Sequence, residues 1–178
     1  MFTAFLKLPK VNGYYLWLLP DDSTSEIYRT EINRLASIYN SIPFEPHITI
    51  SSLPDREPEV LIKILHKICK KISSFILDFT EAVYGELPYQ KITLPARPTA
   101  EFTSICHVID SVLDGDFSKK TFPHLSLLYG YQPRELLLDE LEAHKNKSFP
   151  PATIKYLALY KLEGLPNHWQ LVRKIELS

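Results

Sequence analysis

The sequence contains only two cysteines, Cys69 and Cys106, among its 178 residues. Two isolated cysteines exclude a disulfide framework, and they do not have the spacing of a known metal-binding motif. No apolar run approaches the roughly 20 residues that a membrane-spanning helix requires, and the first residues lack the pattern of a signal peptide. The sequence therefore predicts a soluble, intracellular protein in the cytoplasm that has no membrane partner.

Charge of one sign is also lacking, because the formal net charge is −1 at pH 7. This balance excludes the broad basic surface that non-specific nucleic-acid binding requires, although a few contacts could still hold a small nucleotide. We therefore expect a monomer that binds a small nucleotide substrate and forms no stable nucleic-acid complex. Hydrophobic residues make up 45% of the chain, which is enough to build a sizeable core.

Hydrophobic periodicity predicts alternating strands and helices that end in two consecutive strands. The strands are expected at residues 14–19, 47–51, 75–84, 91–94, 124–129, 153–162 and 168–176. The expected helices present apolar faces containing Ile27, Ile32, Leu35, Ala36 and Tyr39, then Val60, Ile64, Leu65, Ile68 and Ile72, then residues of 98–113, and finally Leu136, Leu137, Leu141 and His144. Short turns favour antiparallel pairing, so the pattern indicates the α+β class rather than a doubly wound sheet.

One short pattern occurs twice. Residues 44–51 read FEPHITIS and residues 122–129 read FPHLSLLY, and each stretch follows a predicted helix in its half of the chain. This shared order predicts a single domain over residues 1–178 with two pseudo-symmetric lobes. Each lobe would be an antiparallel sheet with its helices packed outside, and a central cleft would separate the two sheets.

Side chains two residues apart share one face of a strand, so His47 lies beside Thr49 and His124 lies beside Ser126. Two such strands facing each other would gather two imidazoles and two hydroxyls, a set that suits displacement at phosphorus. Near neutral pH one histidine can accept a proton while the other donates one. The hydroxyls would stabilise the charge on the phosphate oxygens. This scheme requires no metal and no cofactor.

The ordinary interpretation of one His-x-Thr triplet is a strand residue with a local hydrogen bond. Two copies, each preceded by proline and each on an apolar strand, favour catalysis instead. The chain resembles the two-histidine phosphoesterase superfamily through H47-I-T49-I50 and H124-L-S126-L127. It is most similar to the cyclic phosphodiesterase branch, because Y15-L-W17-L-L-P20 and Tyr129 also match.

The resemblance implies hydrolysis of nucleoside 2′,3′-cyclic phosphate to the 2′-phosphate, or of ADP-ribose 1″,2″-cyclic phosphate to the 1″-phosphate. It implies catalysis by His47 and His124, phosphate binding by Thr49 and Ser126, and a substrate pocket lined by Trp17 and Tyr129. The preferred order has His124 activating water and His47 protonating the leaving oxygen, but the sequence leaves this order open. A redox role for either cysteine also stays open.

Several residues have an equally ordinary interpretation. Tyr15 is expected in the core, whereas Trp17 could stack on a base. Tyr129 would reach the pocket only if its strand ended near Leu128. Among the basic residues Lys91, Arg97, Lys119 and Lys120, the last two are the best candidates for holding phosphate. The remaining histidines, His66, His107, His144 and His168, are expected to be structural or exposed.

Two alternatives remain. An RNA 2′,5′-ligase-like or oligonucleotide phosphodiesterase activity could occupy the same scaffold, although the near-neutral charge speaks against long nucleic-acid substrates. A non-catalytic nucleotide-binding module could also carry both motifs.

Overall fold

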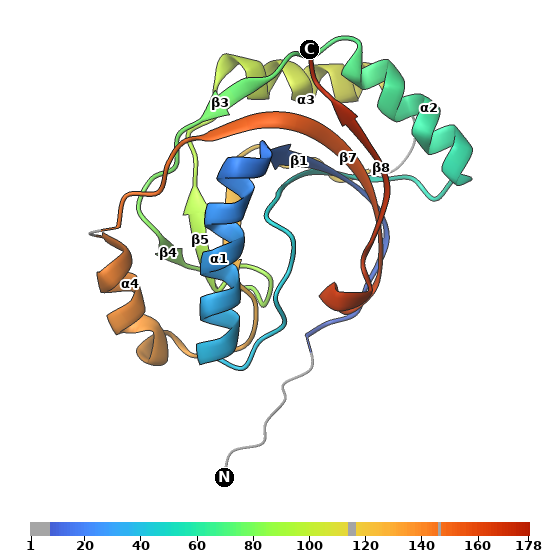
Figure 1. Cartoon of the computed structure of the whole chain (residues 1–178). Helices are drawn as coiled ribbons and strands as arrows, with labels where there is room; N and C mark the ends of the chain where they lie inside the picture. Colours follow the sequence, from blue (N-terminus) through green and yellow to red (C-terminus); the bar gives the residue numbers. More distant parts are fainter. Residues whose placement is uncertain (1–7, 114–116, 146) are drawn as a thin grey trace.

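The computed structural model describes residues 8–113, 117–145 and 147–178. It contains a five-stranded and a three-stranded β-sheet, with the helices packed around them (Figure 1). Every strand pair in these described residues is antiparallel, which confirms the α+β class. The two sheets correspond to the two expected lobes, although they are unequal in size.

The larger sheet is built on two long neighbouring strands, β1 (Val11–Pro20) and β7 (Ala152–Gly164), which pair along most of their length. β2 (Ile48–Leu53) pairs with β1 on its other side. β3 (Phe75–Leu77) and β8 (Gln170–Glu176) pair with successive parts of β7. β7 is visibly curved in Figure 1, so the larger sheet has a concave and a convex side.

The smaller sheet has the strand order β4 (Val83–Tyr84), β5 (Ile92–Pro95) and β6 (His124–Leu128). The single strand predicted over residues 75–84 is therefore wrong, because β3 belongs to the larger sheet and β4 to the smaller one. Alternating apolar side chains report that one face of a segment is buried. They do not show which strand a segment pairs with, and here the partner strand changes from β7 for β3 to β5 for β4.

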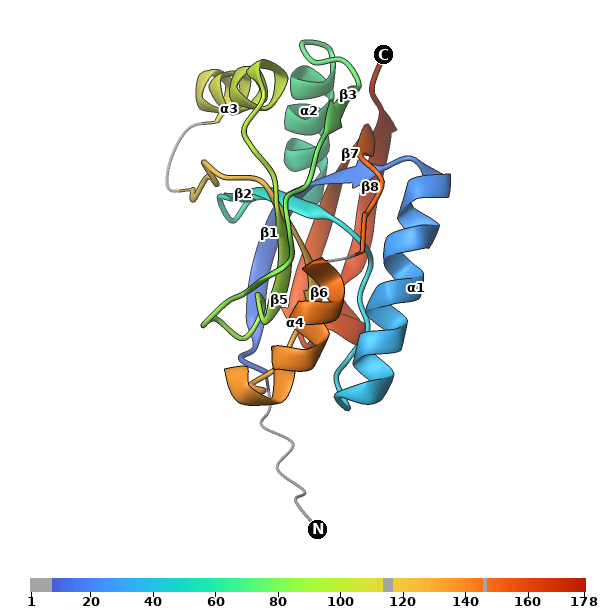
Figure 2. The same ribbon diagram turned by 90° about the vertical axis from the view of Figure 1, so that its left-hand side faces the viewer.

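The helices lie outside the two sheets (Figure 2). Their bounds are α1 (Asp22–Ile38), α2 (Pro58–Cys69), α3 (Ala100–Val112) and α4 (Leu138–Lys145), with short 3-10 helices η1 (Arg134–Leu137) and η2 (Pro166–His168). α2 and α3 pack against each other at one end of the molecule (Figures 1 and 2). In the part of the chain that the structure describes, no helix is both long and apolar enough to cross a membrane.

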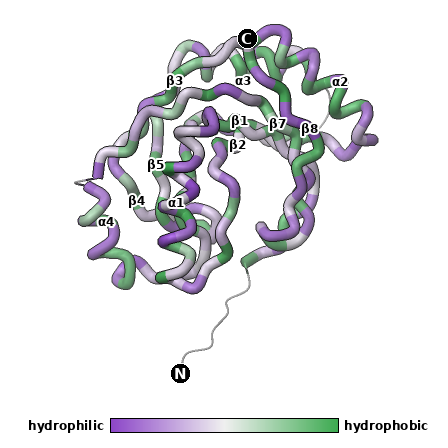
Figure 3. Tube along the Cα trace, viewed as in Figure 1, coloured by the Kyte–Doolittle hydropathy of each residue, from purple (hydrophilic) through white to green (hydrophobic). Residues whose placement is uncertain are grey.

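Most residues expected on the apolar faces of the helices are buried, such as Ile32, Leu35, Ile64 and Ile68, but three expected residues are exposed. These three are Ile27, Val60 and Leu136, and the residue that follows each of them is buried: Tyr28, Leu61 and Leu137, of which only Leu137 was expected to face the core. Consecutive helical residues differ by about 100° in direction, so either one can border an apolar stripe. The alternation of apolar and polar residues along α2 is visible in Figure 3.

The two faces of the larger sheet have different roles. Leu16 and Leu18 of β1 belong to a large core that also contains the buried side chains of α1, α2 and α3. Trp17 and Leu19 point to the opposite face and form a small cluster with residues of β7. No helical residue of the described chain belongs to this second cluster, so this face of the sheet is available for a binding site.

Candidate active site

A cavity on the helix-free face of the larger sheet brings together all six side chains that the sequence singled out. The first motif contributes His47 and Thr49, and the second contributes His124 and Ser126. The two aromatic residues, Trp17 and Tyr129, also line the cavity. The first motif lies at the start of β2 in the larger sheet, and the second lies in β6 of the smaller sheet. The cavity therefore lies where the two sheets meet.

His47 is held from two sides. Its Nδ1 lies 2.6 Å from the backbone carbonyl of Glu45, and a carbonyl can only accept, so Nδ1 carries the hydrogen. Its ring is stacked on Trp17 and is 7% exposed. Burial is the main cause that lowers the pKa of His47 to about 4, and the nearby charge of His124 acts in the same direction. The Nε2 atom is left available to a substrate.

His124 has a closely similar arrangement at the first residue of β6. A backbone hydrogen bond joins it to Phe122, two residues earlier, as Glu45 stands two residues before His47. Its Nε2 lies 3.2 Å from the side-chain amide nitrogen of Gln90. An amide nitrogen can only donate, so Nε2 of His124 presents a lone pair. Burial lowers the pKa of His124, and the charge of Lys120 lowers it further.

The two hydroxyls of the site differ in their surroundings. Ser126 is buried, and its Oγ donates a hydrogen bond of 2.9 Å to the backbone carbonyl of Tyr89. Thr49 is half-buried at the cavity wall, and no hydrogen bond to its hydroxyl occurs within the described residues. Only the Thr49 hydroxyl is therefore ready to donate to a ligand without breaking a bond to the protein.

Trp17 lies at the cavity, but not as a stacking platform for a base. His47 covers one face of the indole with 3.5 Å between ring centroids, and Tyr160 covers the other at 4.0 Å. Both faces are thus occupied, and the base stacking expected from the sequence does not fit this geometry. The indole Nε1 is buried without a hydrogen-bond partner among the described residues. Trp17 supports His47.

Tyr129 reaches the cavity because its strand ends one residue earlier, at Leu128. Gly130 then has a φ of 145°, a backbone conformation that favours glycine, and so the chain turns away from the strand direction. The ring of Tyr129 is stacked on Phe44 with 3.6 Å between centroids. Tyr129 therefore joins the segment before the first motif to the end of the second one.

Six further residues at the cavity wall were not predicted as site residues, and two of them, Val11 and Leu162, are aliphatic. Tyr15, which we expected in the core, is half-buried there together with Tyr89, Gln90 and Trp169. Tyr89 and Gln90 belong to the loop between β4 and β5, and Trp169 stands between η2 and β8. Loops and turns have no hydrophobic periodicity, so only the presence of aromatic residues beside predicted turns could have drawn attention to them.

Of the four basic residues considered for phosphate binding, one lines the cavity and three do not. Lys120 lines the cavity, whereas Lys119 forms an ion pair with Asp110. Lys91 is buried, and its ammonium group donates to the Tyr84 hydroxyl and to two backbone carbonyls. Arg97 is exposed and does not line the cavity. Lys120 is therefore the cation best placed to meet a bound anion.

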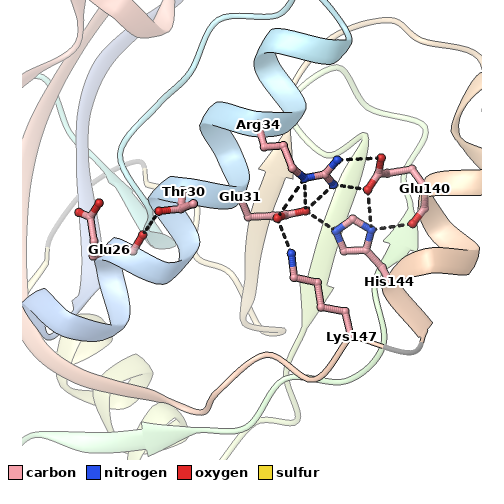
Figure 4. A network of polar contacts seen from close by, with 7 residues as sticks. All are labelled: Glu26, Thr30, Glu31, Arg34, Glu140, His144 and Lys147. Atoms are coloured by element: carbon pink, nitrogen blue, oxygen red, sulfur yellow. Dashed lines mark hydrogen bonds and ion pairs between the residues drawn. The ribbon is translucent and has the colours of Figure 1, made fainter.

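A second polar cluster links α1 to α4 away from the cavity (Figure 4). Glu31, Glu140 and His144 are close enough together to be considered for a metal ion. Arg34 bonds to both carboxylates, however, and Lys147 bonds to Glu31 (Figure 4). These cations already balance the charge, so the cluster acts as a structural ion-pair network, in line with the structural role expected for His144.

The remaining histidines and the cysteines lie outside the cavity. His66, His107 and His168 are exposed. Cys69 and Cys106 are free thiols. Burial raises the pKa of Cys69 to about 11 and raises that of Cys106 as well, so neither thiol is activated as a nucleophile.

Comparison of the sequence with known proteins identifies its family. The family described as "Cyclic phosphodiesterase-like protein" matches residues 12–177. A protein of Arabidopsis thaliana named "Cyclic phosphodiesterase" is 21% identical over 140 residues, covering 79% of this chain and 75% of that protein. The sequence match therefore extends over nearly the whole domain.

Solved structures show the same fold. Escherichia coli LigT complexed with 3′-AMP superimposes with a TM-score of 0.57 at 12% identity, covering 94% of this chain and 98% of LigT. The protein TT0787 of Thermus thermophilus gives a TM-score of 0.60 at 13% identity, covering 92% of this chain and 97% of TT0787. The chain is thus a phosphodiesterase that belongs to the cyclic phosphodiesterase-like family of the two-histidine phosphoesterase superfamily.

Proposed function

We propose that the protein hydrolyses small nucleotides that carry a cyclic phosphate, by acid–base catalysis with His47 and His124 and without a metal. The observation that carries this proposal is the paired arrangement of the two imidazoles. Each ring forms a hydrogen bond with the backbone of the residue two positions before it. Both rings line one cavity. This arrangement would leave Nε2 of His47 for a bound group, and it would offer Nε2 of His124 once the Gln90 amide turns away.

In the proposed reaction, the oxygen of a water molecule attacks the phosphorus of a nucleoside 2′,3′-cyclic phosphate. His124 accepts the proton from this water, and the bond between phosphorus and the 3′ oxygen breaks. His47 donates a proton to that oxygen, so the products are a 2′-phosphate and a free 3′ hydroxyl. The same steps would open ADP-ribose 1″,2″-cyclic phosphate to the 1″-phosphate.

His47 must be protonated to act as the acid, yet burial holds its pKa at about 4 in the substrate-free protein. A bound cyclic phosphate carries a negative charge, and an opposite charge within about 4–6 Å favours the protonated imidazole. Substrate binding would therefore raise the pKa of His47 and supply the acid when it is needed. The hydroxyl of Thr49 would donate to a non-bridging phosphate oxygen.

A direct test incubates the protein with 2′,3′-cyclic nucleotides and ADP-ribose 1″,2″-cyclic phosphate in excess EDTA. Phosphorus NMR then identifies the phosphate isomer that forms. We expect the 2′-phosphate or the 1″-phosphate, and no product from His47→Ala or His124→Ala variants that retain the fold. Full activity in either variant, or an absolute metal requirement, would refute the proposal.

The same assay separates the alternatives. Faster cleavage of an oligonucleotide ending in a cyclic phosphate than of the mononucleotide would favour an oligonucleotide phosphodiesterase. Tight binding of cyclic nucleotides without any product would favour a binding module.

A further inference from the structure

The loop between β4 and β5 contacts both polar side chains of the second motif. The backbone carbonyl of Tyr89 accepts the hydrogen bond of Ser126, and the amide nitrogen of Gln90 lies 3.2 Å from Nε2 of His124. Among the described residues, no equivalent amide lies beside Nε2 of His47. The loop thus acts on one of the two histidines and makes them different.

This loop is fixed firmly enough to position a side chain. The buried ammonium group of Lys91 donates to the carbonyls of Gly85 and Glu86 at 3.2 and 3.0 Å. The backbone N–H of Gly130 donates to the carbonyl of Pro88 at 2.7 Å. A Cβ at Gly85 would lie 2.0 Å from the carbonyl oxygen of Gln90, so only glycine permits this approach.

We infer that Gln90 is a positioning residue for the histidine that acts as the base. Its amide donates to Nε2 of His124 in the substrate-free protein and so holds this atom as an acceptor that faces the cavity. The inference rests on the proposed function and adds to it, because it gives a structural reason why His124 and His47 take different roles.

The chemistry of the contact supports this role. A donor beside Nε2 stabilises the neutral imidazole and opposes its protonation. The ammonium group of Lys120 acts in the same direction, and the other titratable groups that share the cavity are His47, Tyr89 and the remaining tyrosines. Because Nε2 has a single lone pair, water displaces the Gln90 amide before His124 accepts its proton. Nε2 of His124 then becomes a donor, and the Gln90 side chain can turn its oxygen to accept.

The decisive variant is Gln90→Glu, which keeps the shape of the side chain and replaces a donor by a negatively charged acceptor. The pKa of His124 is measured by NMR titration of the substrate-free protein, with the signal assigned from a His124→Asn variant. We expect a rise of at least about one unit, because an opposite charge at this distance favours the imidazolium.

Two further variants complete the test. Leu87→Glu places the same charge on the same loop at an exposed position outside the cavity, and it should move the pKa of His124 much less. Gln90→Ala removes the donor and should raise this pKa by about half a unit. Equal shifts in Gln90→Glu and Leu87→Glu would overturn the inference. The titration needs no turnover, so an inactive wild-type protein would refute the proposed function while still testing Gln90.

Discussion

The imidazole of His47 lies parallel to the indole of Trp17, with 9° between the ring planes and 3.5 Å between the centroids. Tyr160 packs on the opposite face of the indole, so three rings form one continuous stack. The stack excludes water from one side of His47 and leaves its Nε2 for the cavity. Trp17 therefore determines the environment of the proposed acid.

Removing the indole should change the titration of His47. In Trp17→Ala, water would reach the imidazole, and we expect the pKa of His47 to rise from about 4 toward its ordinary value of about 6.5. The lost packing should also lower the free energy of unfolding by about 3–5 kcal/mol. NMR titration and urea unfolding measure the two effects.

Trp17→Phe is the matched control, because it retains an apolar ring beside His47. We expect its His47 pKa to stay close to that of the wild type, and this variant also keeps the test valid if Trp17→Ala does not fold. An unchanged pKa in a folded Trp17→Ala protein would contradict the idea that the indole causes the shift.

The two motif hydroxyls should not be equivalent. The Ser126 hydroxyl already donates to the carbonyl of Tyr89, whereas the Thr49 hydroxyl can donate to phosphate directly. We expect Thr49→Ala to lower kcat by about 100- to 1,000-fold, the loss typical of one oxyanion donor. Ser126→Ala should cost only about tenfold in kcat, together with about 1 kcal/mol of stability because the Tyr89 carbonyl loses its donor.

Thr49→Ser restores a hydroxyl and should recover most of the activity lost in Thr49→Ala. Steady-state kinetics on one cyclic nucleotide, combined with urea unfolding, test both sites. A larger loss of kcat in Ser126→Ala than in Thr49→Ala would show that the resting hydrogen bond does not decide which hydroxyl binds phosphate.

Lys120 and Lys119 offer a matched pair of neighbouring cations. Lys120 lines the cavity, and Lys119 is engaged by Asp110. We expect Lys120→Met to raise KM by about two- to fivefold at low salt, because an exposed charge pair contributes up to about 1 kcal/mol. The dependence of KM on ionic strength should weaken in the same variant.

Lys119→Met should leave both KM and its salt dependence unchanged. Equal effects in the two variants would mean that Lys120 acts through the general charge of the surface. The comparison also bears on the substrate, because ADP-ribose 1″,2″-cyclic phosphate carries additional phosphate charges that a nucleoside 2′,3′-cyclic phosphate lacks.

The two histidines and two hydroxyls could be found in the sequence because strand periodicity is strictly local. The spacing of His47 from Thr49 alone determines that they share a face, and the second motif repeats the signal. The family resemblance then supplied Trp17 and Tyr129. The sequence also gives the condition under which Tyr129 reaches the cavity, which is that its strand ends near Leu128, and β6 ends at that residue.

Contacts between segments that lie far apart in the sequence could not be predicted from local periodicity. Gln90 meets His124 because a loop folds over the second motif, and Trp169 meets the cavity because a turn precedes β8. The role of Trp17 was misjudged for the same reason, since Tyr160 lies far along the chain and covers the ring face that a base would need. Periodicity describes one segment, whereas these roles depend on the partner segment.

The low pKa of His47 also predicts how stability depends on pH. The folded-state value is about 4 and the unfolded value is about 6.5, so between these limits the unfolded chain binds a proton that the folded chain excludes. The buried, neutral His47 therefore makes its full contribution to the free energy of unfolding above about pH 6.5, and this contribution is lost as pH falls toward 4. Between pH 7 and pH 5, His47 alone should remove about 2 kcal/mol of stability.

His47→Gln cannot be protonated, so urea unfolding at pH 7 and pH 5 should show about 2 kcal/mol less acid destabilisation in this variant than in the wild type. His124 shifts in the same direction as His47 and His144 in the opposite one, but both are present in each protein, so their contributions cancel in the comparison. His66→Gln, at an exposed position, controls for the loss of a histidine. Parallel loss of stability in wild type and His47→Gln would show that His47 titrates normally in the folded protein, and that the stack with Trp17 does not exclude the proton.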